Sequence, residues 1–383
     1  MLHIGIDLRP LLTPVKTGVG EYTFELLNAL FLLDSSNQYY LFYNATTSSP
    51  GLPAWQQDNL HWIGSGWPNK IFNASLALGG VPRLDRLITK RLKKGVQKLD
   101  WFFSPNFGFT ALSNKTKSIL TVHDLSFEFF PNFFSPRQRL WHRVIRPKRQ
   151  CQRADLIITP STNTKRDLID YYRLKPEKIT VIYPGLSSVF TPGSRPDTEA
   201  IKKKYNLPAK FILFIGTVEP RKNVGGLLRA FEQLATVNPE QHLIIAGAPG
   251  YRYQKIEQQI KKSKIKDRLR YMNYVATADK PGLYALAELF VYPSFYEGFG
   301  FPVLEALASG IPVITSNRSS LSEITQNKAY LINPNKPHEI TEAMLRILQN
   351  NELKNRLITG GLEQSKQFTW DKAAQQFLNL LNV

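Results

Sequence analysis

The sequence predicts an α/β protein made of two successive doubly wound units. Its 383 residues exceed what one typical domain core accommodates. Short apolar runs alternate with amphipathic stretches along the whole chain, which is typical of parallel sheets covered by helices. Residues 187–200 hold two prolines and a glycine with few apolar side chains, and a second series of apolar runs begins after them. We therefore expect a linker there, with one unit on each side.

The apolar runs place the strands of both units. In the first half we expect strands at residues 2–8, 39–43, 100–104, 118–123, 155–160 and 179–183. In the second half we expect them at residues 211–218, 242–248, 268–272, 289–293, 312–315 and 330–332. The segments between them have helical periodicity, as in the face formed by Leu227, Leu228, Phe231 and Leu234. Ligands of such sheets bind where the strands end, so residues following the strands are the candidate site residues.

Composition excludes several classes of protein. A single cysteine, Cys151, excludes an intramolecular disulfide framework and a multi-thiolate metal site. No apolar run is long enough to span a bilayer as a helix. The first residues are typical of a strand and lack a basic leader, so we expect a cytoplasmic protein without a signal peptide. The Asn-x-Ser/Thr triplets at Asn44, Asn73 and Asn114 are then chance matches.

The net charge of +19 indicates attraction to a polyanion, which could be a nucleic acid, an anionic membrane or a phosphorylated substrate. Basic residues gather in two clusters, at 70–98 and 137–153. In the second, arginines alternate with Leu140, Trp141, Val144 and Ile145, a mixture that suits an amphipathic helix lying on anionic lipid. A solvated basic face is the alternative interpretation.

The strongest motif for function spans residues 293–306, where a buried strand is followed by a glycine-bearing loop and a helix that starts near Pro302. Such a loop directs a helix N-terminus and backbone N–H groups at an anion. We expect Glu297 in the loop and Glu305 in the first helical turn, where each carboxylate could accept hydrogen bonds from a diol. Alternatively Glu305 only complements the helix dipole and Glu297 lies on the surface. The surrounding residues favour a ligand site, and its candidates are Ser294, Glu297, Gly298, Phe299, Gly300 and Glu305.

Three shorter motifs also follow strands. In the first, at residues 216–223, Gly216 precedes Arg221 and Lys222, which could bind a diphosphate as a planar fork and a point charge. In the second, Gly18 and Gly20 stand ahead of a helix with Leu26, Leu27, Leu30 and Phe31 on one side, but they lack the spacing of a dinucleotide site.

The third of these motifs is Thr121-Val122-His123-Asp124 at a strand end. His123 could contact a bound hydroxyl there, with Asp124 fixing the orientation of the imidazole. A structural role for this histidine is the alternative, since single histidines at strand ends are commonly structural.

Together and in this order, the four motifs resemble the retaining glycosyltransferases of family 4, which have the GT-B fold. Glu297 and Glu305 resemble the paired glutamates of that family, and residues 216–223 are similar to its basic motif as written in the mannosyltransferase branch. The resemblance implies an acceptor-side domain at 1–188, a donor-binding domain at 189–364, and a last segment, 365–383, whose helix packs back on the first domain. The two Rossmann-like domains of this fold face each other across a cleft.

The resemblance also implies roles for individual residues. Arg221 and Lys222 would hold the donor diphosphate and stabilise the leaving group, and Glu305 would bind the ribose. Glu297, with the amides of Phe299 and Gly300, would hold the transferred sugar. Gly20 would contact the distal phosphate and His123 the sugar. Glu323 matches a family position, but a structural role for it is an equal alternative. Residues 326–329 depart from the family pattern. We assign a role to neither.

The mechanism implied by the resemblance has the acceptor hydroxyl attack from the face that the diphosphate leaves, while a donor phosphate oxygen takes the proton. No protein nucleophile, cofactor or metal is expected, and the chain has no Asp-x-Asp triplet. The branch suggests GDP-mannose as donor, with UDP- and ADP-sugars open, and a glycan or lipid-linked glycan as acceptor. The basic clusters would bind the protein peripherally to the inner face of the plasma membrane.

Two other functions stay open at this point. One is a nucleotide-sugar epimerase of the same architecture, which donor and transfer assays would distinguish. The other is a basic nucleic-acid-binding protein, although no recognised nucleic-acid motif forms around Trp141 and His142. We therefore expect no nucleic-acid partner.

Overall fold

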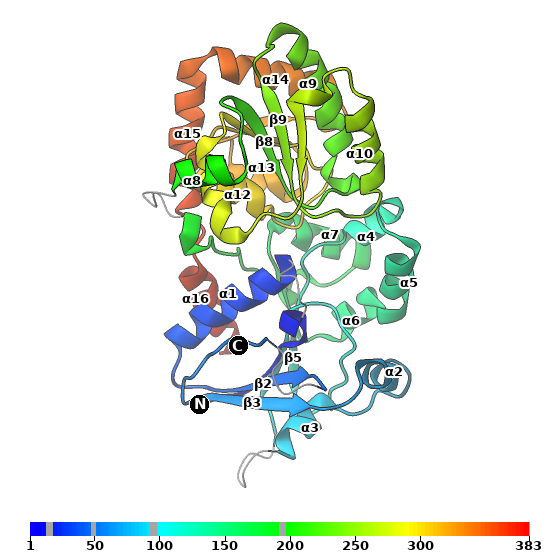
Figure 1. Cartoon of the computed structure of the whole chain (residues 1–383). Helices are drawn as coiled ribbons and strands as arrows, with labels where there is room; N and C mark the ends of the chain where they lie inside the picture. The colour runs from blue at the N-terminus through cyan, green and yellow to red at the C-terminus, as the bar shows by residue number, and fades with distance from the viewer. Residues whose placement is uncertain (13–17, 47–50, 92–97, 191–196, 383) are drawn as a thin grey trace. The chain divides into compact units, whose positions relative to one another are not determined.

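The computed structural model describes residues 1–12, 18–46, 51–91, 98–190 and 197–382, and these residues form two compact units (Figure 1). Unit 1 contains Met1–Leu125, Pro136–Gly185 and Thr369–Val383. Unit 2 contains Ser126–Ser135 and Leu186–Phe368. The chain therefore enters unit 2 briefly at residues 126–135, between two strands of unit 1, and returns to unit 1 with its last helix.

Unit 1 is built on a seven-stranded parallel sheet in the order β3-β2-β1-β4-β5-β6-β7. Its strands are β1 (His3–Asp7), β2 (Gln38–Asn44), β3 (Leu60–Ser65), β4 (Trp101–Ser104), β5 (Lys117–Thr121), β6 (Leu156–Thr159) and β7 (Ile179–Val181). The order reverses between β1 and β4, which makes the ends of these two strands the switch point of the sheet. The sheet is buried between helices, so β4 and the end of β5 contain only buried residues.

The helices of unit 1 follow the apolar faces that the sequence predicts. Its helices are α1 (Gly18–Leu33), α2 (Asn69–Gly79), α3 (Leu84–Thr89), α5 (Pro136–Ile145), α6 (Pro147–Arg153), α7 (Thr162–Tyr172) and α16 (Trp370–Leu381). Leu26, Leu27, Leu30 and Phe31 of α1 are buried, as expected. The last helix, α16, packs against α1, and its Phe377 contacts Phe103 of β4 edge to face with ring centroids 4.8 Å apart.

Unit 2 is built on a six-stranded parallel sheet in the order β10-β9-β8-β11-β12-β13. Its strands are β8 (Phe211–Ile215), β9 (His242–Ala246), β10 (Leu269–Met272), β11 (Leu289–Tyr292), β12 (Val313–Ser316) and β13 (Tyr330–Ile332). Here the order reverses between β8 and β11. The loops that follow β8 and β11 are therefore the expected place for a ligand.

The helices of unit 2 cover both faces of this sheet (Figure 1). They are α4 (Ser126–Phe129), α8 (Thr198–Lys204), α9 (Val224–Val237), α10 (Tyr253–Lys262), α11 (Lys280–Leu286), α12 (Phe301–Ala308), α13 (Ser319–Thr325), α14 (Pro337–Gln349) and α15 (Asn351–Ser365). The predicted face of α9, with Leu227, Leu228, Phe231 and Leu234, is fully buried. No helix among the described residues is long and apolar enough to cross a bilayer.

Three predictions of local structure need correction. The expected linker at 187–200 includes helical residues, since Phe190 is buried in a short 3₁₀ turn and α8 starts at Thr198 behind the N-cap Asp197. The strand β3 was missed because it is an edge strand whose buried positions are interrupted by His61, Trp62 and a glycine. The arginine-rich segment forms two helices, α5 and α6, since Arg146 between them has a left-handed backbone with φ 51°.

Candidate functional site

The loop after β8 is fixed by its own backbone and by its neighbours. Pro220–Lys222 forms a 3₁₀ turn that ends at Asn223, whose φ of 55° is tolerated by asparagine better than by most residues. The Asn223 side chain donates a hydrogen bond to the Pro334 carbonyl at 2.7 Å. The Arg221 carbonyl accepts one from the Phe295 amide at 2.9 Å. The loops after β8 and β11 are thus joined directly at the switch point.

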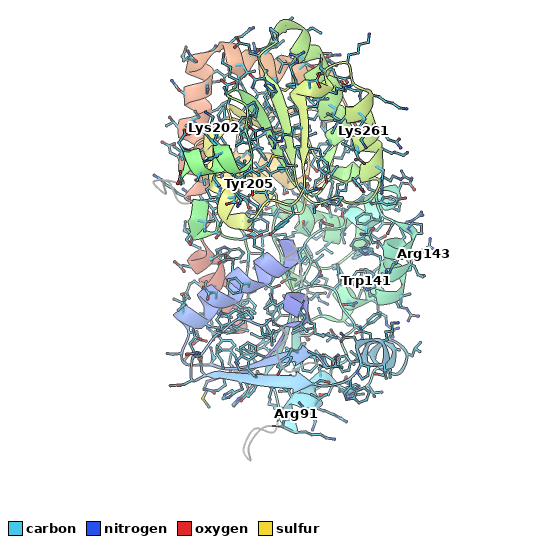
Figure 2. The ribbon with its side chains drawn as sticks, in the orientation of Figure 1. Arg91, Trp141, Arg143, Lys202, Tyr205 and Lys261 are labelled. Carbon is cyan, nitrogen blue, oxygen red and sulfur yellow. The ribbon has the colours of Figure 1, made fainter. Side chains whose placement is uncertain are left out.

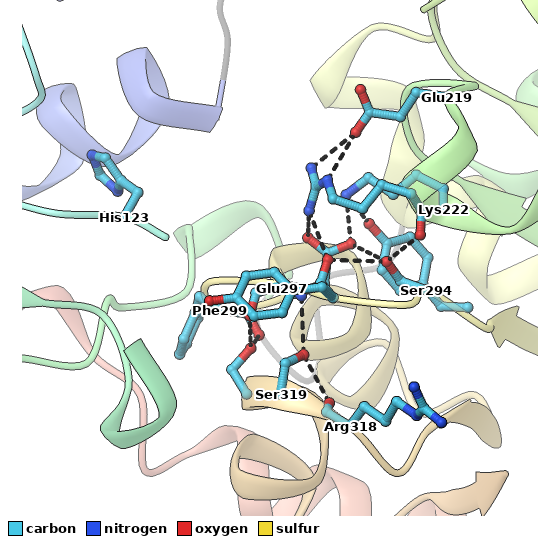
Figure 3. A network of polar contacts seen from close by, with 12 residues as sticks. His123, Glu219, Lys222, Ser294, Glu297, Phe299, Arg318 and Ser319 are labelled. Atoms are coloured by element: carbon cyan, nitrogen blue, oxygen red, sulfur yellow. Dashed lines mark hydrogen bonds and ion pairs between the residues drawn. The ribbon is translucent and has the colours of Figure 1, made fainter. Parts of the chain in front are cut away.

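Glu297 lies at the centre of a buried polar network between these two loops (Figure 3). Its Oε1 accepts hydrogen bonds from Lys222 Nζ at 2.6 Å and from Ser294 Oγ at 2.7 Å. Its Oε2 accepts one from Arg221 Nη1 at 2.7 Å. Glu297, Lys222 and Ser294 are at most 8% exposed. The structure therefore unites four of the predicted site residues through direct contacts.

The charges in this network determine its protonation. Burial alone would raise the pKa of Glu297, but Arg221 and Lys222 outweigh that effect and lower it to about 2. The pKa of Lys222 is lowered by burial and by the neighbouring Arg221 cation. The network also includes the Tyr292 hydroxyl, which is 2.6 Å from Lys222 Nζ. Glu297 is thus an ionised carboxylate shared by two cations.

Glu219 is a member of this network that the sequence interpretation missed. Its Oε1 accepts hydrogen bonds from Arg221 Nε at 3.2 Å and Nη2 at 2.9 Å, while Nη1 also donates to the Tyr296 carbonyl at 2.9 Å. Two glutamates therefore balance the two cations that were expected to bind a diphosphate. Most donors of the Arg221 guanidinium already face protein oxygens, so the open planar fork that we expected is engaged in this structure.

The loop after β11 leads into α12 through a glycine that the conformation requires. Gly300 is the N-cap residue, with a φ of 118° that L side chains rarely adopt, and an added Cβ would lie 2.7 Å from Leu321. Pro302 follows in the first turn, as predicted. Ser320 Oγ lies 2.6 Å from the Phe299 carbonyl and 3.0 Å from the Glu297 carbonyl. Gly298, Phe299 and Gly300 are buried, which keeps the loop compact.

Glu305 was expected in the first turn of the helix, and that prediction is wrong. The helix α12 begins at Phe301, so Glu305 lies one turn further along and does not complement the helix N-terminus. It is 3% exposed and accepts hydrogen bonds from two residues of α11. Lys280 Nζ is 3.0 Å from its Oε1 and 3.4 Å from its Oε2, and Tyr284 Oη donates to Oε2 at 2.9 Å. Nothing in the local sequence around Lys280 or Tyr284 indicates this contact.

The remaining predicted residues divide between the two units. In unit 2, Gly216 directly follows β8 and is half-buried. In unit 1, α1 begins at Gly18, so Gly18 and Gly20 are part of its first turn and do not form a loop ahead of it. Thr17 of that motif lies outside the described residues. Gly18 is exposed and Gly20 is buried.

His123 follows β5 in unit 1 and is half-buried. Its Nε2 donates a hydrogen bond to the Pro105 carbonyl at 2.9 Å, which ties it to the end of β4. Its ring packs edge to face on Tyr22 of α1, with centroids 4.8 Å apart. Burial lowers the pKa of His123, and the Pro105 carbonyl and Asp124 oppose that effect only in part. His123 is therefore neutral at neutral pH and is held beside the end of β4.

Among residues 1–12, 18–46, 51–91, 98–190 and 197–382, no three His, Cys, Asp or Glu side chains are grouped so that they could hold an ion. Glu323 is half-buried in α13.

Two family models match this chain, and together they cover most of it. The model described as Glycosyltransferase Family 4 matches residues 17–188, and the model described as Glycosyl transferases group 1 matches residues 197–364. The O-antigen chain mannosyltransferase B of Escherichia coli is 29% identical over 380 residues, which is 96% of this chain and 97% of that protein. The mannosylfructose-phosphate synthase of Agrobacterium fabrum is 28% identical over 70% of this chain and 60% of its own length.

Solved structures share the fold at low sequence identity. The sucrose-phosphate synthase of Thermosynechococcus elongatus superposes with a TM-score of 0.75 at 19% identity and covers 100% of this chain and 98% of its own. The Anabaena protein Alr3699/HepE in complex with UDP-glucose superposes with a TM-score of 0.72 at 16% identity, over the whole of both chains. The predicted fold class, two doubly wound Rossmann-like units of the GT-B type, is confirmed.

Proposed function

We propose that this chain, whose two halves match glycosyltransferase family models, is a family 4 enzyme that moves mannose from GDP-mannose to a glycan or a lipid-linked glycan. The chain is a retaining glycosyltransferase of polysaccharide synthesis, as its family models and relatives indicate. The choice of mannose rests on the Escherichia coli O-antigen chain mannosyltransferase, whose similarity extends over nearly the full length of both chains. UDP- and ADP-sugars are the alternative donors.

The observation that carries the proposed site is the buried Glu297 network at the switch point of unit 2. We assign the donor diphosphate to Lys222 and Arg221, and the transferred sugar to Glu297 with the amides of Phe299 and Gly300. As the bond between sugar and phosphate breaks, negative charge develops on the diphosphate, and a preorganised buried cation stabilises it more strongly than water does. A donor phosphate oxygen accepts the proton of the acceptor hydroxyl.

The remaining assignments complete this proposed mechanism. Glu305 would bind the ribose of the donor, Gly20 would present its amide to the distal phosphate, and His123 would contact the sugar. Ser294, Gly216, Gly18 and Gly298 would shape the surrounding backbone. We further propose that no metal takes part, because Lys222 and Arg221 supply the positive charge. Turnover should then be unchanged by EDTA and by added Mg²⁺.

A donor screen tests the proposal most directly. Purified protein is heated with GDP, UDP or ADP at matched concentrations, and the shift in melting temperature is measured. We expect the largest stabilisation from GDP, because ligands that bind only the folded state raise its stability. The protein is next given GDP-[¹⁴C]mannose with and without a mannose-containing acceptor, and NMR of the product gives the anomeric configuration. Protection by UDP alone would reject mannose from GDP as the substrate, and a product of inverted configuration would reject the mechanism.

The same assay separates the two alternative functions. An epimerase would change the sugar of the donor without an acceptor, while a transferase leaves the donor sugar unchanged until an acceptor is present. A nucleic-acid-binding protein would bind oligonucleotides with steep salt dependence and would not be protected by any nucleoside diphosphate.

We also propose that the chain works at the inner face of the plasma membrane, where lipid-linked acceptors lie, and that α5 makes the contact. Leu140, Trp141 and Val144 of α5 are 61%, 41% and 48% exposed. Figure 2 shows Trp141 and Arg143 on this helix. Arg137, Arg139 and Arg143 on the same short helix are also exposed, while Ile145 anchors it in the core. Apolar and aromatic side chains flanked by arginines suit the boundary between anionic headgroups and acyl chains.

Vesicle sedimentation tests this location. We expect binding to phosphatidylglycerol vesicles and little binding to phosphatidylcholine vesicles at equal lipid. Changing both Arg139 and Arg143 to Glu should reduce the bound fraction severalfold, and changing Leu140 and Val144 to Ser should weaken binding at high salt. The matched control changes Lys262 and Lys264, which are exposed in unit 2, to Glu, giving the same change of net charge. Equal losses in both charge variants would mean that net charge alone drives the binding.

A further inference from the structure

Lys280 and Tyr284 lie one helical turn apart on α11, and both direct their polar atoms at one carboxylate. That carboxylate is Glu305, on the helix that follows the β11 loop. Lys280 Nζ is within 3.0 and 3.4 Å of its two oxygens, so the ammonium lies across both of them. Neither α11 residue belongs to any motif of the family resemblance.

The exposures of the three residues show which member of this cluster faces outward. Glu305 is 4% exposed in its side chain and Tyr284 is fully buried, while the Lys280 side chain is 17% exposed. Lys280 Nζ lies 5.9 Å from the centroid of the Phe190 ring, and this ring packs edge to face on Tyr284. The carboxylate therefore lies deeper in the protein, and its only cationic partner among the described residues lies nearer the surface.

A carboxylate buried to this degree is costly without a counter-charge, because the protein interior solvates it poorly. Lys280 supplies that charge and Tyr284 supplies one neutral hydrogen bond. A carboxylate has about four acceptor directions. The contacts from Lys280 and Tyr284 leave acceptor capacity on Oε1, which receives a hydrogen bond from Lys280 alone among the described residues. A vicinal diol needs two acceptor positions on neighbouring oxygens, and a carboxylate of fixed orientation provides them.

We propose that Lys280 is a positioning residue for nucleotide binding, which orients the Glu305 carboxylate so that it accepts the 2′- and 3′-hydroxyls of the donor ribose. This inference rests on the proposed function and deepens it, because it assigns ribose recognition to a lysine–glutamate pair. Lys280 acts through Glu305, so its loss should affect discrimination between riboses more than the chemistry of transfer.

A comparison of ligands measures this role separately from general binding. The affinities of GDP and 2′,3′-dideoxy-GDP are measured by calorimetry, and their ratio reports the contribution of the ribose hydroxyls. If UDP or ADP protects the protein better in the donor screen, that nucleotide and its dideoxy form are used instead. For the wild-type chain we expect the ribonucleotide to bind at least about tenfold more tightly, as is typical of hydrogen bonds to a charged group.

Three variants complete the test. In Lys280→Met the ratio should fall to about twofold, because the carboxylate loses its counter-charge and its fixed orientation. Lys280→Arg keeps the charge and should retain most of the preference. Lys336→Met removes a lysine from an exposed ion pair with Glu339 in the same unit and should leave the ratio unchanged. In steady-state assays, Lys280→Met should raise KM for the donor several-fold with kcat within about twofold.

The possible outcomes separate this inference from the proposed function. A Lys280→Met variant that melts like the wild type and keeps its ribose preference would overturn the role of Lys280. Equal weakening of GDP and dideoxy-GDP binding would mean that Lys280 is only structural, and this too would overturn the inference. If the wild type binds no nucleoside diphosphate at all, the proposed function itself fails. If it binds GDP without any ribose preference, only the inference fails.

Discussion

Glu297 and Glu305 look alike in the sequence but occupy different electrostatic environments in the structure. Glu297 lies in the loop after β11, with two cations and a serine around its carboxylate. Glu305 lies in α12, with one cation and a tyrosine. Both are at most 6% exposed, so the difference does not come from burial. It comes from the charges that neighbouring elements bring to each carboxylate.

This comparison indicates that Glu297 and Glu305 have different roles. Both oxygens of Glu297 are engaged in a network that Glu219 extends to the far side of Arg221. A ligand that binds Lys222 or Arg221 has to add to these contacts or exchange with them. Glu305 has a single cation that lies nearer the surface, so its carboxylate can accept further hydrogen bonds. We infer that the network around Glu297 is rigid and suited to a charged ligand group, whereas Glu305 is suited to binding hydroxyl groups.

The largest effect should follow from removing the charge of Glu297. In Glu297→Gln the buried Arg221 and Lys222 cations lose their shared partner, and breaking a buried pair in this way typically costs about 3–5 kcal/mol. Urea unfolding of the variant measures the loss. The control is Glu240→Gln, because Glu240 pairs with Lys210 on the surface and should contribute much less to stability. Equal losses would contradict the importance of burial.

Acid should destabilise the wild-type protein through the same group. The pKa of Glu297 is about 2 in the folded protein against an ordinary 4.5, so its ionisation stabilises the fold. That contribution is fully present above pH 4.5 and is lost as the pH falls towards 2, and it amounts to about 3 kcal/mol. Unfolding free energies measured from pH 7 to pH 2 should show the slope in this window. Glu297→Gln should have a shallower slope, and parallel profiles would exclude Glu297 as its source.

Removing Lys222 should slow turnover, and the corresponding free energy should be somewhat smaller than the loss of stability expected for Glu297→Gln. Lys222→Ala removes the buried cation assigned to the leaving diphosphate, and such losses typically reduce kcat by about two orders of magnitude. Lys210→Ala, which changes an exposed lysine of the same unit, serves as the control. A folded Lys222→Ala variant with wild-type kcat would remove Lys222 from the proposed mechanism.

The smallest effect should follow from Glu305→Gln. A neutral amide accepts hydrogen bonds less strongly than a carboxylate, so we expect nucleotide affinity to fall about tenfold. Because only one cation loses its partner, the loss of stability should be smaller than in Glu297→Gln. Calorimetry and urea unfolding of the two variants test this order. A reversal of the two stabilities would contradict the comparison between the acids.

Much of the fold could be predicted because buried parallel strands are short apolar runs. Twelve of the strands were expected, six in each unit, from runs such as the fully buried residues of β8 and β11. The edge strand β3 was missed because half of its residues are not fully buried and its apolar run is broken. The break between α5 and α6 was missed because Arg146, a residue that usually has negative φ, takes a left-handed conformation there.

The candidate site was predicted where local sequence encodes it. The loop after β11, its glycine and the proline of α12 follow from backbone geometry, which depends on neighbouring residues. Two helix starts were predicted wrongly. The helix α1 already begins at Gly18, and α12 begins early enough that Glu305 lies in its second turn. Helix starts depend on capping details that a pattern of apolar residues does not contain. Glu219 was inside a predicted motif, but its contact with Arg221 was not foreseen.

The sequence by itself determined the two doubly wound units, the residues that follow their strands, and the glycosyltransferase family that the chain resembles. These depend on apolar periodicity and on short motifs, both of which are local. Only the tertiary structure decided which cation faces which carboxylate. Lys222 meets Glu297 across 75 residues and Lys280 meets Glu305 across 25, because the strand order and the packing of α11 on α12 bring them together. A buried charge is controlled by whatever lies within a few ångströms of it, and those distances exist only after folding.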